Sequence, residues 1–109
     1  MDAARSIVEE VDRLLDTGEL LRQGQLRESA ESIASNIREA YGQRPGRARA
    51  KFFVHSRGSA EETDEHLWAN FKARRLDESV FWRLHNRIAV VVRILSKLIA
   101  REDHNNRED

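Results

Sequence analysis

Hydrophobic residues recur every three or four positions along most of this chain, a spacing that is typical of amphipathic helices. The spacing predicts helices over residues 3–16, 19–41, 47–74 and 77–101. Glycine or proline stands in the first two gaps between these segments, where such residues end helices. Four helices joined by short turns predict an all-α fold, an antiparallel up-down-up-down four-helix bundle.

The last predicted helix carries apolar residues on two sides. At about 100° per residue, Leu84, Val91 and Leu95 share one arc, whereas Val90 and Ile94 fall on another side of the helix, about 100° from the centre of that arc. The second pair indicates either a wide core face or a contact with another subunit. Val90 and Ile94 are therefore the candidate oligomer interface.

The length of 109 residues fits one domain, which we expect to span residues 1–101, followed by a polar C-terminal tail at 102–109. The absence of cysteine excludes a disulfide, a thiolate nucleophile and a Cys-ligated metal. The longest apolar run, residues 88–92, is far shorter than the roughly 20 residues that span a bilayer. No export signal precedes the first helix, so we expect a cytoplasmic protein with no membrane contact.

Charge cancels over the whole chain, with 19 basic and 19 acidic residues, but not locally. Basic residues gather at the turn between the second and third predicted helices and along the fourth, and such clusters can neutralise phosphates. The alternative is that they are solvated or pair with the acidic first helix. The candidate nucleic-acid contacts are Arg44, Arg47, Arg49, Lys51, Arg83 and Arg87.

No motif for catalysis or metal binding is recognisable. The Glu-x-x-His pairs of diiron bundles are missing, the helical serines lack a nucleophile elbow, and residues 42–46 lack the Lys-Ser/Thr ending of a phosphate loop. We therefore expect a protein that is not an enzyme and that uses no metal or cofactor.

Polar residues interrupt the apolar stripes of the second and third predicted helices. These side chains could satisfy one another and fix the register of the two helices, or they could make separate solvated contacts. If carboxylates that pair with Arg57 are buried, Arg57→Ala should cost several kcal/mol. The predicted network consists of Ser32, Asn36, Glu39, Arg57, Ser59 and Glu62.

Two motifs resemble a known family. Residues 25–42 read Q-L-R-E-S-A-E-S-I-A-S-N-I-R-E-A-Y-G, and residues 56–62 read S-R-G-S-A-E-E. They are similar to the four helix bundle protein family, also called the 23S ribosomal RNA intervening-sequence protein family. Its pattern is roughly Q-L-R-x-A-x-S-I-x-x-N-I-x-E-G-x-G-R, then A-R-G-S-x-x-E. Relative to this pattern the chain has one extra residue between Arg27 and Ala30, and it departs from the pattern at Ala40 and Ser56, where the family has Gly and Ala.

The resemblance implies four-helix protomers in a ring-shaped homopentamer, with no known enzymatic activity. It implies a bacterial gene, either free-standing or within an intervening sequence of a ribosomal RNA gene. Related bundles assist reverse transcriptases in diversity-generating retroelements and engage nucleic acid through a basic ring surface. We therefore expect a homo-oligomeric scaffold that binds RNA or DNA, with a reverse transcriptase as one candidate partner. The alternative, favoured by zero net charge, is a purely protein-binding or structural ring.

Overall fold

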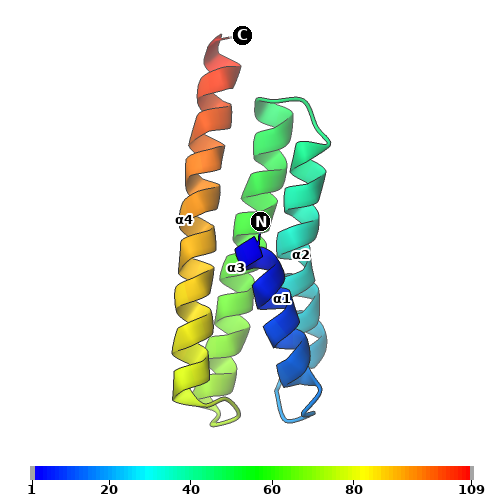
Figure 1. The fold of residues 1–109 in the computed structure, drawn as a ribbon, viewed down its shortest axis with the longest axis vertical. Coiled ribbons are helices and arrows are strands. Elements are labelled where there is room, and N and C mark those ends of the chain that lie inside the picture. The colour runs from blue at the N-terminus through cyan, green and yellow to red at the C-terminus, as the bar shows by residue number, and fades with distance from the viewer. Residues whose placement is uncertain (1, 109) are drawn as a thin grey trace.

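The described chain consists of helices joined by short turns. A computed structural model describes the backbone of residues 2–108 and the side chains of residues 2–104, so Met1 and Asp109 lie outside the described part. Within it the helices are α1 (Asp2–Leu15), α2 (Gln23–Tyr41), α3 (Arg47–Lys72) and α4 (Glu78–Glu108), and no strand occurs (Figure 1). The predicted all-α class with four helices is confirmed.

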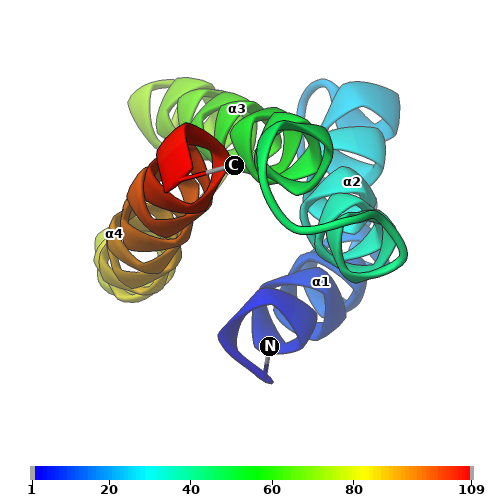
Figure 2. The same ribbon diagram turned by 90° about the horizontal axis from the view of Figure 1, so that it is seen from above.

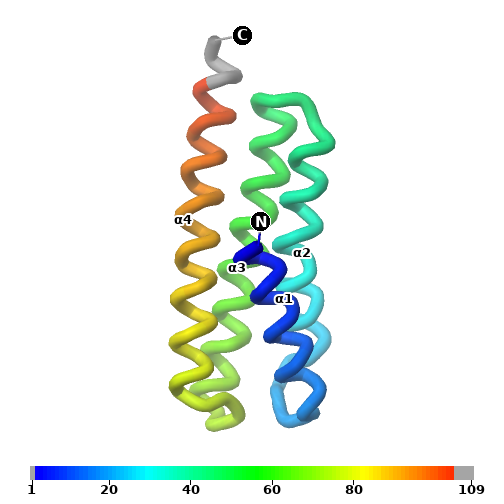
Figure 3. Tube along the Cα trace, in the orientation of Figure 1, coloured from blue at the N-terminus to red at the C-terminus, as the bar shows by residue number. Residues whose placement is uncertain are grey.

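The helices form an elongated molecule with extents of 50 × 20 × 19 Å. Helix α3 packs between α2 and α4, and α1 contacts α2 and α4 on the side away from α3 (Figure 2). Since α1 is short, it covers only part of the length of its neighbours (Figures 1 and 3). Four helices therefore pack together at one end of the molecule, and three pack together at the other.

The core is a column of aliphatic and aromatic side chains contributed by all four helices. Burying one large apolar side chain contributes about 1.5–3 kcal/mol, so this column is the main source of stability. Most of these core residues lie at positions where the apolar spacing predicts the buried face of a helix. Its fully buried members include Ile7, Val11, Leu26, Ile33, Phe53, Leu67, Leu84, Val91 and Leu95.

The second helix begins at Gln23, later than residue 19 where the periodicity predicts it. Asn70, a buried residue of α3, binds the backbone of the segment before α2 and keeps that segment out of a helical conformation. The Leu21 backbone N–H donates to Asn70 Oδ1 at 2.6 Å, and Asn70 Nδ2 donates to the Leu21 carbonyl at 3.1 Å. Arg22 then enters the left-handed region at φ 57° directly before the helix. The backbone N–H and carbonyl of Leu21 are therefore hydrogen-bonded to α3 and are not available to start a helix.

Helix α4 continues past Arg101 to Glu108, beyond the end that the sequence predicts. Glu102, placed in the polar tail by the sequence analysis, is buried against the α2–α3 turn. Its carboxylate accepts a hydrogen bond from the Gly46 backbone N–H at 2.6 Å and lies 3.7 Å from Arg49 Nη1. These contacts fix the helical turn after Arg101, so Glu102 belongs to the bundle.

Candidate nucleic-acid interface

One end of the molecule carries most of the excess positive charge. It is built from the second half of α2, the turn after it, the first half of α3 and the C-terminal part of α4 (Figure 1). Residues 35–58 and 93–104, which we call the basic end, hold nine Arg or Lys and three Asp or Glu, a formal charge of +6. Residues 2–34 and 59–92 hold nine basic and fourteen acidic residues, a charge of −5. Although the net charge of the chain is zero, positive charge is therefore concentrated at the basic end and negative charge in residues 2–34 and 59–92.

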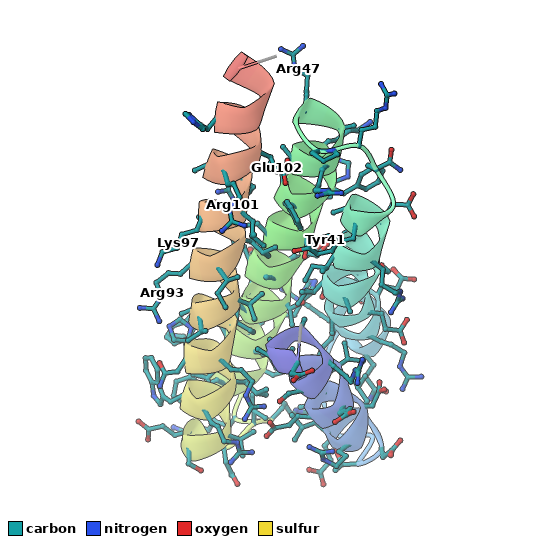
Figure 4. All side chains as sticks on the ribbon, turned by 45° about the horizontal axis from the view of Figure 1, so that its top comes forward. Tyr41, Arg47, Arg93, Lys97, Arg101 and Glu102 are labelled. Atoms are coloured by element: carbon teal, nitrogen blue, oxygen red, sulfur yellow. The ribbon has the colours of Figure 1, made fainter. Side chains whose placement is uncertain are left out.

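Three of the predicted contacts in the turn region are available to a ligand. Arg44, Arg47 and Lys51 are exposed, and none of them has an ion-pair partner among the described residues. Arg47 projects from the basic end of the bundle in Figure 4. These basic side chains therefore lie at a surface that solvent and a polyanion can reach.

Arg49 lies in the same segment but holds the turn together. Its Nε donates to the Ala40 carbonyl at 3.1 Å and its Nη2 to the Gln43 carbonyl at 3.0 Å. The guanidinium also lies 5.3 Å from the centre of the Tyr41 ring and pairs with Glu102. Because its donors are engaged within the chain, Arg49 positions the turn that presents the exposed cations.

Arg83 and Arg87 lie outside the basic end and bind Glu10 of α1. Both nitrogens Nε and Nη2 of Arg83 donate to Glu10 Oε1, and Arg87 Nη1 donates to Oε2 at 2.7 Å. Burial would raise the pKa of Glu10, but the hydrogen bonds and charges of the two arginines outweigh it and hold this pKa below its usual value. Of the alternatives that the sequence leaves open, the structure places this pair with the acidic first helix.

The C-terminal part of α4 adds cations that the candidate set omits. Arg93, Lys97 and Arg101 follow one another at four-residue spacing and are exposed. They make no ion pair within the described part of the chain, and Arg93 and Lys97 project away from the bundle (Figure 4). The signal for them in the sequence is the spacing itself, since positions four apart share a helix face.

The structure brings together half of the predicted polar network. Ser59 Oγ of α3 donates to Ser32 Oγ of α2 at 2.8 Å, and Asn36 Nδ2 donates to the same oxygen at 2.8 Å. A second hydroxyl pair that the sequence analysis missed lies one turn away, where Thr63 Oγ1 and Ser29 Oγ are 2.9 Å apart. Hydrogen bonds between short hydroxyl side chains therefore link α2 to α3.

The charged members of the predicted network bind other partners. Glu39 accepts from Gln43 at 3.2 Å, and Glu62 lies 3.4 Å from His66 of its own helix. Arg57 donates to the Ser96 hydroxyl of α4 at 3.1 Å. Long side chains reach the rim of a helix contact, whereas the close α2–α3 approach is filled by residues with short side chains.

Val90 and Ile94 are 38% and 37% exposed on the outer side of α4, and neither belongs to the core or packs against it. They are therefore available to a partner.

Within residues 2–104, no group of three or more His, Asp or Glu side chains is arranged to hold a metal ion. None of the helices in the described range has the length and apolar content to cross a membrane.

The comparisons with known proteins identify one family. Its model, described as 23S rRNA-intervening sequence protein, matches residues 1–97. The matched range includes the first three helices and α4 as far as Lys97. No curated protein and no solved structure matches the chain.

Proposed function

Because the chain belongs to the 23S rRNA-intervening sequence protein family, we propose that it is a non-catalytic scaffold that binds RNA or DNA and assembles with copies of itself. The observation that carries the proposal is the charge of +6 at the basic end of a neutral chain. Phosphate binding depends on local charge, because each cation that neutralises a phosphate releases a counterion. Zero net charge is therefore no argument against a nucleic-acid ligand.

The proposed phosphate contacts are Arg44, Arg47 and Lys51, which are exposed beside a turn that Arg49 and Glu102 hold in place. Such contacts position a nucleic acid without reading its sequence. Arg83 and Arg87 are better explained as partners of Glu10. The proposal therefore concerns one end of the bundle.

The test is a fluorescence-anisotropy titration of a mixed pool of structured and single-stranded RNA at two salt concentrations. The variant R44E/R47E/K51E is compared with R5E/R13E/R27E, which reverses three exposed arginines outside the basic end. Both variants change the total charge equally, so only position differs. We expect the first to lose most of the affinity and about 2–3 units of the slope of log K against log salt, and the second to keep both. Equal losses, or binding that salt does not weaken, would overturn the proposal.

A purely protein-binding scaffold is the second candidate, and the exposure of Val90 and Ile94 favours it. It predicts that the protein assembles without binding the RNA pool even at low salt. Light scattering on the titration sample measures the mass of the assembly, and the anisotropy of the RNA pool at low salt separates the two functions.

Further parts of the proposal rest mainly on the family. These are a ring-shaped homopentamer, a cytoplasmic location and a reverse transcriptase as one candidate partner. The antiparallel up-down-up-down order has support from contacts as well. Gly46 before α3 meets Glu102 late in α4, and Leu21 before α2 meets Asn70 late in α3.

A further inference from the structure

The outer side of α4 is an amphipathic surface that nothing in the described chain covers. Val90 and Ile94 form its apolar part, and Lys97 and Arg101 flank them. We call these four residues the α4 ridge. A surface with an exposed apolar pair and unpaired cations fits a partner that is apolar at its centre and acidic at its edge.

An open groove between α3 and α4 complements the α4 ridge, because it is apolar at its floor and acidic at one edge. Its floor is apolar, formed by Ile88, Ala89 and Val92, and Trp68 is 44% exposed at its wall. Its acidic edge consists of Glu61, Asp64 and Glu65 on α3, with Arg93 at the opposite edge. We call this feature the acidic groove.

Two of the three carboxylates of the acidic groove are available to a partner. Asp64 binds His85 Nδ1 at 2.8 Å. Glu61 and Glu65 are exposed and have no ion-pair partner within the described part of the chain. A nucleic acid would be repelled by this edge, whereas a basic surface would be attracted.

We propose that the α4 ridge of one copy docks in the acidic groove of a second copy of this chain. Lys97 and Arg101 are four residues apart on one helix, and Glu61 and Glu65 are four apart on another, so each pair spans about 6 Å along its axis. The equal spacing lets two opposite-charge contacts form together. Val90 and Ile94 then cover the apolar floor, which supplies most of the favourable free energy.

The ridge and the groove are different surfaces, so this contact is heterologous. On the α4 wheel, the centre of the ridge lies roughly 160° from the centre of the groove-floor residues. A copy that is docked in the groove leaves the ridge of the same subunit free for the next copy. A repeated heterologous contact closes into a ring or continues as a filament. The inference thus rests on the proposed self-assembly and assigns its interface.

The test uses two charge-reversal variants of the full chain, E61R/E65R and K97E/R101E, with light scattering as the readout. Each variant alone brings like charges together at the contact, so we expect it to lose assembly. Combined in one chain, E61R/E65R/K97E/R101E places a reversed groove against a reversed ridge at every contact, so assembly should return for any number of copies. The control E28R/E31R reverses two exposed carboxylates of α2 and should assemble like the parent chain.

Ile94→Asp gives an independent check, because Ile94 is outside the core and its replacement should abolish assembly while leaving the helical circular dichroism unchanged. A parent chain that stays monomeric, single-surface variants that assemble like the parent, or a combined variant that fails to assemble would each overturn the proposed interface. The RNA titration of the same parent protein is a separate readout. Failure of the interface is therefore distinguishable from failure of nucleic-acid binding.

Discussion

At the scale of single residues, the most informative contact is that of Glu10 with Arg83 and Arg87. It joins α1 to α4 through a carboxylate that is 8% exposed. Because the arginines hold the pKa of Glu10 below its value in the unfolded chain, ionised Glu10 stabilises the fold at pH values above that unfolded pKa. This stabilisation is lost as the pH falls through the lowered pKa of the folded state.

We therefore predict that Glu10→Gln lowers the free energy of unfolding at pH 7 by about 1–2 kcal/mol, the size expected for hydrogen bonds to a charged group whose partners are partly exposed. The difference from the parent chain should shrink as the pH falls into the acidic range. Urea unfolding at several pH values measures it, and Glu9→Gln, an exposed neighbour, is the control. A difference that stays constant with pH would contradict the role assigned to Glu10.

At the scale of the helices, the side-chain hydrogen bonds between α2 and the middle of α3 join uncharged groups. The α2–α3 contact uses the hydroxyls of Ser29, Ser32, Ser59 and Thr63. Arg57, one of the charged residues that the sequence analysis places in this contact, donates instead to the hydroxyl of Ser96 on α4. Its expected contribution therefore differs from that of an arginine between buried carboxylates.

We predict that Arg57→Ala lowers the free energy of unfolding by about 1 kcal/mol, as for one hydrogen bond to a neutral partner, and by the same amount at neutral and acidic pH. Arg87→Ala is the comparison, because its partner Glu10 is a carboxylate and its effect should fade in acid. Parallel urea titrations measure both. An effect of Arg57→Ala that also fades in acid would show a carboxylate partner.

Local patterns predict the helices and most of the core, because apolar spacing depends only on which face of a helix is buried. They do not predict partners that are far apart in the chain. The apolar spacing predicts a helix at residues 19–22, where the structure has Leu21 bound to Asn70. It ends the last helix at residue 101, where the structure has Glu102 bound to Gly46. The basic turn was visible as a cluster, but only the fold distinguishes Arg49, which binds carbonyls, from exposed Arg47.

At the scale of the whole molecule, the short first helix makes stability uneven. Helix α3 packs against α2 and α4 along the bundle, whereas α1 contacts its neighbours over part of their length only (Figures 1 and 2). Elements with little buried surface open more readily than the central ones. Opening of α1 also requires only the Glu10 contacts and one apolar stripe to be broken.

We predict that backbone amides of α1 exchange with solvent deuterium faster than those in the middle of α3. The expected order reflects local opening of α1 while the other three helices stay packed. Hydrogen exchange followed by mass spectrometry at neutral pH measures it. Equal protection of α1 and α3 would mean that the four helices open as one unit.

Trp68 and Trp82 are the two tryptophans of the chain, and each is 44% exposed on the α3–α4 side. Indole emission shifts to shorter wavelength when water leaves its surroundings, so the protein carries its own optical probe at this location. Without any label, the time course of that shift after dilution or mixing would report how fast the surface around the acidic groove is covered and uncovered.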